Sequence, residues 1–152
     1  MKTGRYFDDL AIGERWQGGD IHVSEEEIVR FARAYDPQPM HTDPDAAANS
    51  RFGGVIASGW NVAALVMRDN VDSSPLGAAP MLGMEIERLR WLRPVRAGDV
   101  LRARREITGL RLSRSKPDQG IVRMKTEVTN QEGEEVMTFS LVMQVPARPP
   151  AD

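Results

Sequence analysis

The strongest constraint on the fold is a change of hydrophobic pattern near residue 80. Before it, apolar residues recur at helical spacing. After it come four runs of strand length, residues 81–91, 100–110, 120–129 and 135–145, separated by turn sequences. The third of these runs alternates with a period of two, as a half-buried strand does. Helices followed by several antiparallel strands are typical of an α+β fold.

The segment before this change predicts one strand and two helices. Residues 15–23 have the length of a first strand. Ser24 is a helix N-cap, and Glu27 three residues later completes a capping box. Apolar residues then follow at helical spacing up to Tyr35, where Pro37 and Pro39 end the helix. Pro44 suits the first position of a short second helix.

A longer apolar stretch, residues 58–71, predicts a helix that is buried on more than one face. Its natural place is against the face of the predicted sheet. A single sheet that wraps one helix leaves a sheet edge open, and an open edge favours pairing with a second copy of the chain. We therefore expect a homodimer as the minimum unit.

Length and composition exclude several classes of protein. The chain has 152 residues, which favours one domain, here residues 1–145, followed by a Pro-rich tail, residues 146–152, expected to be a loose end. There is no cysteine, which excludes disulfides, thiolate nucleophiles and cysteine-bound zinc. A net charge of -2 argues against nucleic acid as a partner. No run approaches the ~20 apolar residues of a membrane helix, and residues 1–9 do not resemble a signal peptide, so we expect a cytoplasmic protein.

Only two histidines are present. His22 lies in the first predicted strand and is interpreted as a surface or rim residue. His41 ends the sequence YDPQPMH, in which two prolines stiffen the chain between Asp36 and His41. A carboxylate and an imidazole that flank one water can divide the two proton transfers of thioester hydration. The alternative is a loop in which the aspartate caps a turn and the histidine is merely exposed.

Gly59 opens the long apolar helix, within the sequence GGVIASGW. A glycine at a helix start leaves its backbone N–H free, and the positive end of the helix dipole lies in the same place. A thioester carbonyl bound there would be polarised toward the enolate that forms during attack. Gly59 also permits close packing of the helix against the sheet, and the two interpretations are compatible.

The segment FARAYDPQPMHTDPDAAANSRFGGVIASGW, residues 31–60, resembles the MaoC-like dehydratase family, also called R-specific enoyl-CoA hydratases or hydratase type 2. The likeness extends to residues 92–99, LRPVRAGD. It implies a hot-dog fold, in which an antiparallel sheet wraps a long central helix, usually in dimers. It also places the catalytic pair on Asp36 and His41 and the oxyanion-hole glycine on Gly59. The implied substrates are thioesters of CoA or acyl carrier protein, with no metal and no cofactor.

The sequence departs from the family pattern at several positions of the site. Gln38 replaces the usual Asn, Ser58 replaces a frequent His, and Trp60 replaces a frequent Met. A serine found in the helix of some members appears here as Ala64 or Met67. We expect Gln38, Trp60 and Met67 to contact the substrate, with the two bulky side chains shortening the acyl tunnel.

A basic stretch formed by Arg111, Arg114 and Lys116 precedes a Pro-Asp turn. Guanidinium and ammonium groups suit the phosphates of CoA, so we assign these three residues to substrate binding. The alternative is a solvated hairpin tip.

Three functions are consistent with these features. The first is a hydratase or dehydratase that reversibly adds water to a trans-2-enoyl thioester. The second is a hot-dog acyl-CoA thioesterase, in which Asp36 activates water for attack on the carbonyl carbon. The third is a non-catalytic acyl-CoA-binding subunit that pairs with a catalytic partner.

Overall fold

The structure is a computed structural model and describes residues 5–77 and 79–152. The expectation that residues 1–9 are not a signal peptide concerns, in residues 1–4, a segment outside the described residues. The first half contains η1 (Phe7–Asp9), β1 (Arg15–Gln17), β2 (Ile21–His22), α1 (Glu25–Tyr35), α2 (Pro39–Thr42), α3 (Pro44–Ala48) and α4 (Gly59–Ser73). The second half contains β3 (Leu82–Trp91), β4 (Val100–Leu112), β5 (Gln119–Thr129) and β6 (Glu135–Pro146).

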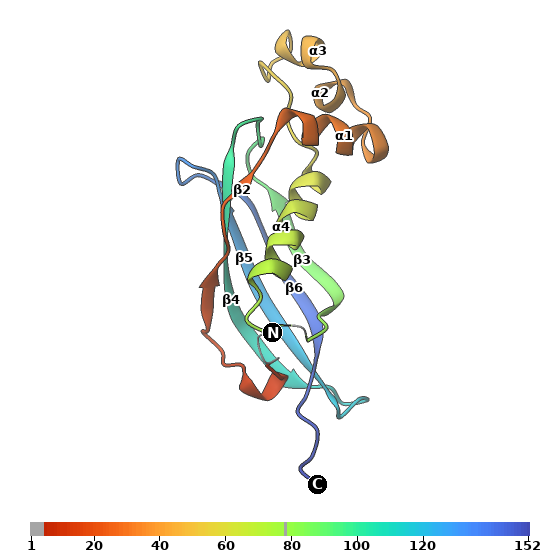
Figure 1. The fold of residues 1–152 in the computed structure, drawn as a ribbon, viewed down its shortest axis with the longest axis vertical. Helices are drawn as coiled ribbons and strands as arrows, with labels where there is room; N and C mark the ends of the chain where they lie inside the picture. The colour runs from red at the N-terminus through yellow and green to blue at the C-terminus, as the bar shows by residue number, and fades with distance from the viewer. Residues whose placement is uncertain (1–4, 78) are drawn as a thin grey trace.

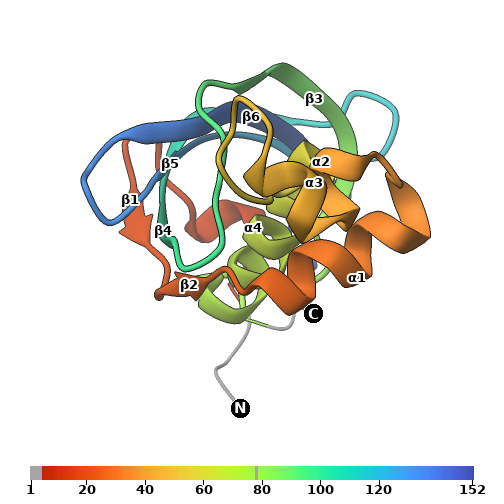
Figure 2. The same ribbon diagram turned by 90° about the horizontal axis from the view of Figure 1, so that it is seen from above.

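The strands form one antiparallel sheet in the order β1-β4-β5-β6-β3, and β2 also pairs with β4. The long strands β4, β5 and β6 pair in sequence order, as short hairpin turns dictate. The sheet curves around α4, which lies against its concave face (Figure 1). Seen from above, the strands enclose this helix on one side (Figure 2). The predicted α+β hot-dog fold is confirmed.

The four predicted strands of the second half are confirmed, but the first predicted strand is wrong as one element. Residues 15–23 are divided into β1 and β2 by Gly18 and Gly19. A Cβ on Gly18 would lie 2.0 Å from a carboxylate oxygen of Asp69. That carboxylate accepts a hydrogen bond of 3.0 Å from the Gly19 N–H. Asp69 of α4 therefore reaches the backbone between the two short strands.

Helix α1 begins where its cap predicts. The Ser24 hydroxyl accepts a hydrogen bond of 3.1 Å from the Glu27 N–H. The Glu27 carboxylate pairs with Arg30 and does not complete the expected capping box. Ile28 is fully buried, whereas Tyr35, expected on the apolar face, is 77% exposed. It lies in the last turn, beside the site described below.

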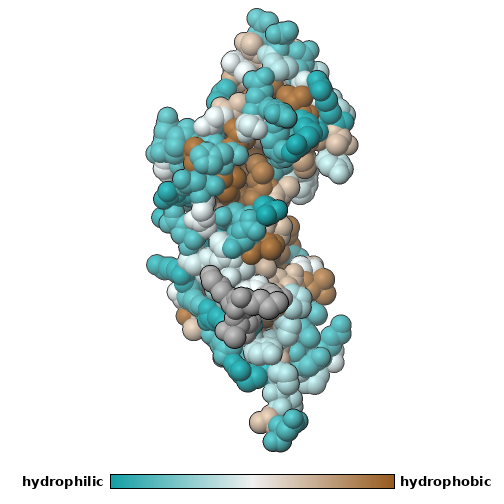
Figure 3. All heavy atoms as spheres, in the orientation of Figure 1, coloured by the Kyte–Doolittle hydropathy of each residue, from teal (hydrophilic) through white to brown (hydrophobic). Residues whose placement is uncertain are grey.

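Helix α4 is buried on one side only, which corrects the expectation of burial on more than one face. Val62 and Val66 belong to the core between helix and sheet. Trp60, Met67 and Val71 are 59%, 44% and 56% exposed. The apolar surface near α4 and the start of β3 appears in brown in Figure 3.

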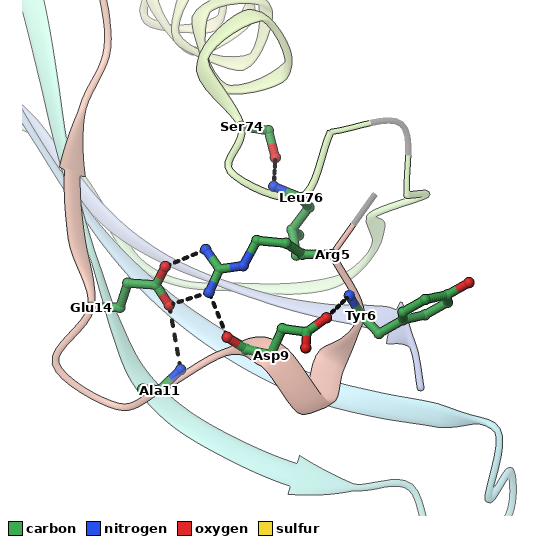
Figure 4. Close-up of polar contacts among 7 residues, drawn as sticks. All are labelled: Arg5, Tyr6, Asp9, Ala11, Glu14, Ser74 and Leu76. Carbon is green, nitrogen blue, oxygen red and sulfur yellow. Dashed lines mark hydrogen bonds and ion pairs between the residues drawn. The ribbon is translucent and has the colours of Figure 1, made fainter. Parts of the chain in front are cut away.

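The two ends of the described chain are held against each other. Arg5 pairs with Glu14 and donates to the Asp9 carbonyl (Figure 4). Arg148, in the predicted tail, donates its backbone N–H to Asp8 at 2.6 Å and pairs with Asp9 at 2.5 Å. The expectation of a loose end from residue 146 is therefore wrong for its first part, because contacts with Asp8 and Asp9, 140 and 139 residues away in sequence, hold Arg148.

Candidate active site

Asp36 and His41 come from two consecutive helices that meet at a stiff bend. Asp36 caps the C-terminus of α1, where its N–H donates to the Ala32 carbonyl at 2.9 Å. Pro39 is the first residue of α2, a position that suits a residue without a backbone donor. The helix break that the prolines impose therefore places the carboxylate of one helix end beside the imidazole of the next helix.

The His41 ring is buried, with 4% of the residue exposed, and both of its nitrogens have partners. Nδ1 lies 2.6 Å from the Ile56 carbonyl oxygen. Because a carbonyl only accepts, Nδ1 carries the hydrogen and Nε2 is left as an acceptor in the neutral ring. Nε2 lies 3.3 Å from Oδ2 of Asp36. The imidazole nitrogen and the carboxylate oxygen therefore face each other directly.

The second oxygen of Asp36, Oδ1, accepts a hydrogen bond of 2.7 Å from the Gln38 side-chain amide. This bond is the main cause that lowers the pKa of Asp36, and the nearby Ser58 hydroxyl lowers it further against the effect of burial. The protonated form of the His41 ring lowers it as well. Asp36 is therefore a carboxylate at neutral pH. Gln38 supplies a donor to this carboxylate in the place where the family pattern has Asn.

Gly59 begins α4 beside this pair and is packed against Trp91. A Cβ on Gly59 would lie 2.4 Å from the Trp91 ring, and the Trp91 Nε1–H donates to the Gly59 carbonyl at 3.0 Å. The expected role of Gly59 in close packing is thus visible. Within the described residues, the Gly59 N–H has no backbone acceptor, as expected for the first turn of a helix.

These residues line one pocket of about 400 Å³. Asp36, Gln38, His41, Gly59 and Trp60, all predicted from sequence, are brought together there. The opposite wall consists of residues 91–95, and the Val95 carbonyl accepts a bond of 2.8 Å from the Ala57 N–H. The pocket therefore combines a carboxylate, an imidazole and a helix N-terminus, the groups needed to move protons beside a polarised carbonyl.

A second, smaller cavity of about 120 Å³ lies between α4 and the sheet. Trp60 lines both this cavity and the Asp36 pocket, whereas Met67 lines only the second. The Trp60 and Trp91 rings pack edge to face with centroids 5.1 Å apart. The indole of Trp60 thus stands between the polar pocket and the apolar one.

The basic hairpin is not brought to this pocket. Arg111, Arg114 and Lys116 are exposed at and beyond the end of β4. The turn between β4 and β5 lies at the opposite end of the molecule from α1, α2 and α3 (Figure 1). Within one chain, these three residues therefore do not reach the Asp36 pocket. The strands β4 and β5 run the length of the sheet, so the turn that joins them lies at the far end from the pocket.

Sequence reasoning missed three contributors to the pocket. Ile56 acts through its main-chain carbonyl, which leaves no trace in the side-chain pattern. The side chain of Ser58, noted only as a departure from the family, is fully buried beside Asp36. Trp91 lies at the end of a predicted strand, and its contact with Gly59 joins residues 32 positions apart.

Among residues 5–77 and 79–152, no group of three or more His, Asp or Glu side chains is placed to hold a metal ion. In the same part of the chain, no helix has the length and apolar composition to cross a membrane.

The fold and pocket define a hot-dog protein with an Asp–His pair at the N-terminus of its central helix. The MaoC like domain family matches residues 10–131, and the chain belongs to that family. The crystal structure of a MaoC-like dehydratase from Rhodospirillum rubrum is 38% identical, with a TM-score of 0.88 over 97% of this chain and 100% of that one.

Two curated relatives carry the names of enzymes that act on thioesters. The 3-hydroxyacyl-thioester dehydratase Z of Mycobacterium tuberculosis is 31% identical over 72% of this chain and 76% of its own. The mesaconyl-CoA hydratase of Cereibacter sphaeroides is 36% identical over 91% of this chain but only 41% of its own length. Hydratases and dehydratases are therefore the named activities among these relatives.

Proposed function

We propose that this protein is an acyl-thioester hydratase or dehydratase that reversibly adds water to a trans-2-enoyl thioester of CoA or acyl carrier protein. The observation that carries the proposal is the buried His41, fixed through Nδ1 and facing Asp36 through Nε2 beside the free N–H of Gly59. Membership of a family with named hydratases and dehydratases supports it.

In the proposed mechanism, one water lies between Asp36 and His41. Asp36 accepts a proton as the water oxygen bonds to the β-carbon, while His41 orients the water. The electron pair of the double bond moves toward the thioester, whose carbonyl oxygen takes up negative charge at the Gly59 N–H. The α-carbon then gains a proton from the pair. Each positioned group is expected to contribute about 10²–10⁴ in rate.

The remaining parts of the proposal concern cofactor, assembly and location. Hydration leaves the overall oxidation state unchanged, so we propose no cofactor. One edge of the open sheet is β3, and it carries the exposed residues Leu82, Met84 and Ile86. We propose that this edge and the apolar face of α4 meet a second copy. A cytoplasmic location stays a prediction from the sequence.

A panel of enoyl-CoA substrates tests the proposal, with the loss of enone absorbance as the readout. A parallel incubation with saturated acyl-CoA, assayed for free thiol, measures thioesterase activity. Hydration without thiol release is the expected result. Thiol release without hydration favours the thioesterase, and no turnover of any substrate by the purified chain favours the non-catalytic subunit.

A further inference from the structure

Strand β3 carries an irregularity shortly before it reaches the Asp36 pocket. Between Glu87 and Arg90 the pairing advances by three residues on β3 but by only two on β6. Arg88 and Leu89 together therefore lie opposite one residue of β6, Phe139. Two residues opposite one define a β-bulge, which bends a strand and re-aims the side chains that follow it.

The first residue of this bulge has an unusual backbone conformation. Arg88 has a φ of +51°, and within the part of the chain that the structure describes no other residue except glycine has a positive φ. A bulge whose first residue is left-handed normally has glycine there, because a Cβ is crowded in this conformation. The bulge therefore forms against the local preference of residue 88. Such positions are found most often beside functional sites.

The bulge decides which side chains of β3 face α4. Side chains of a regular strand alternate between the two faces of the sheet. Ile86 and Leu89 are three residues apart, yet both line the cavity against α4. Trp91, two residues further on, contacts α4 as well. A regular strand with Ile86 on this face would also turn Arg88 and Arg90 toward it, although both are exposed. Leu89 and Trp91 would then face outward.

Trp91 connects the bulge to the start of α4. Its Nε1–H donates to the Gly59 carbonyl at 3.0 Å, and its ring fills the space that a Cβ on Gly59 would need. The ring also packs edge to face against Trp60, the next residue of the helix. The indole therefore fixes the position and the rotation of the first turn of α4. A hydrogen-bond donor stabilises a developing oxyanion only when it is held in the correct direction beforehand.

We propose that Arg88 is a positioning residue of the active site. Its left-handed backbone turns Trp91 toward α4, and Trp91 in turn holds the Gly59 N–H in the direction of the thioester carbonyl. The role belongs to the backbone of residue 88 and does not need the guanidinium group. This inference deepens the proposed function and rests on it for the place of the thioester carbonyl.

Substitutions at residue 88 separate the backbone from the side chain. Arg88→Gly removes the guanidinium and favours the left-handed conformation, so we expect the wild-type kcat for hydration of crotonyl-CoA. Arg88→Val disfavours this conformation, because valine is β-branched. We expect its kcat to fall about ten-fold or more, with a much smaller change in KM. Arg90→Val is the matched control, since Arg90 is exposed in the regular part of the strand, and it should keep the wild-type kcat.

The carbonyl stretch of bound butanoyl-CoA, measured by difference infrared spectroscopy, reports the contact with Gly59 without any turnover. A donor that polarises the carbonyl lowers this frequency. We expect the same lowering in the wild type, Arg88→Gly and Arg90→Val, and a smaller lowering in Arg88→Val. A loss of stability alone would reduce the melting temperature and leave the frequency unchanged. Sedimentation of each variant verifies that its assembly is that of the wild type.

Trp91→Phe is a second test, which decides the matter even if Arg88→Val does not fold. This variant keeps the bulge but removes the Nε1–H that binds the Gly59 carbonyl. We expect it to reduce the lowering of the carbonyl frequency and to reduce kcat.

Three results would overturn the inference. An equal loss of kcat in Arg88→Gly and Arg88→Val would assign the role to the guanidinium. A wild-type kcat and frequency in Arg88→Val, or a wild-type frequency in Trp91→Phe, would show that the bulge does not act on the carbonyl. If the wild type hydrates no enoyl-CoA while the frequency still depends on residue 88, the proposed function is wrong and the inference stands. Hydration without this dependence refutes the inference alone.

Discussion

One hydrogen bond to each side chain fixes the orientation of the His41 imidazole and of the Asp36 carboxylate. Ile56 fixes the imidazole through a backbone carbonyl, and Gln38 holds the carboxylate through its amide. The two bonds act on different groups, so the orientation of the imidazole and the charge state of the Asp36 carboxylate can be tested separately.

The pH dependence of activity tests the role of Gln38. The hydrogen bond from Gln38 is the largest cause that lowers the pKa of Asp36. A carboxylate stabilised in this way stays deprotonated down to a lower pH. Gln38→Leu removes the donor, so we expect the acid limb of the kcat/KM profile to move to higher pH. Gln38→Asn keeps an amide and serves as the control with a smaller shift. An acid limb identical in wild type and Gln38→Leu would refute this assignment.

Gly59 offers a second test at the scale of one residue. A methyl group at this position would lie 2.4 Å from the Trp91 ring, so Gly59→Ala forces the start of α4 away from the end of β3. We expect the variant to lose about 1–3 kcal/mol of stability together with hydratase activity. Gly54→Ala is the matched control, since a Cβ there meets nothing within 4 Å. Equal melting temperatures for the two variants would contradict the packing argument.

At the scale of elements, local sequence signals predicted most of the fold. The Ser24 cap, the prolines after α1 and the alternation in β5 act within a few residues, and each gave an element close to its observed bounds. The same local signals placed Asp36 beside His41. Gly59 was also predicted to belong to the site, because it is the first residue of the next long helix and a helix start is a local feature of the sequence.

Features that depend on distant contacts were not predictable in this way. Asp69 of α4 contacts the backbone where the expected first strand is divided, and Arg148 holds the first part of the expected free tail. No local pattern reveals either contact. The distance between the basic hairpin and the Asp36 pocket was also hidden, because strand length, not residue type, decides where a hairpin tip lies. The contacts of Arg105 in β4 were likewise hidden, since its partners Asp69, Ser73 and Val66 all lie on α4.

The surface of α4 gives a prediction about acyl length. Met67 lines the 120 Å³ cavity that begins at Trp60, so its truncation lengthens the space open to an acyl chain. We expect Met67→Ala to raise kcat/KM for octenoyl-CoA relative to crotonyl-CoA by about ten-fold, which corresponds to roughly 1.4 kcal/mol. Val71→Ala, on the same helix and 56% exposed, is the control. An unchanged ratio in Met67→Ala would show that Met67 does not limit the chain.

At the scale of the whole molecule, the open edge of the sheet predicts the assembly. β3 is bonded on one side only, to β6, and exposes apolar side chains near the apolar face of α4. Sedimentation at micromolar concentration is expected to show a homodimer. Met84→Lys puts a charge on this edge and should shift the protein toward monomer, whereas Leu112→Lys, at the end of β4, should not. A monomeric wild type would contradict this account of the edge.

The central claim is that Asp36 and His41 together carry the proton transfers, and the hydration rate of crotonyl-CoA by purified variants tests it most directly. We predict that Asp36→Asn and His41→Ala each lower kcat by about 10²-fold or more. The double variant should be little worse, because both groups act on one water. His22→Ala, at the exposed position of β2, should retain the wild-type rate. A near-wild-type rate in either Asp36→Asn or His41→Ala would contradict the account.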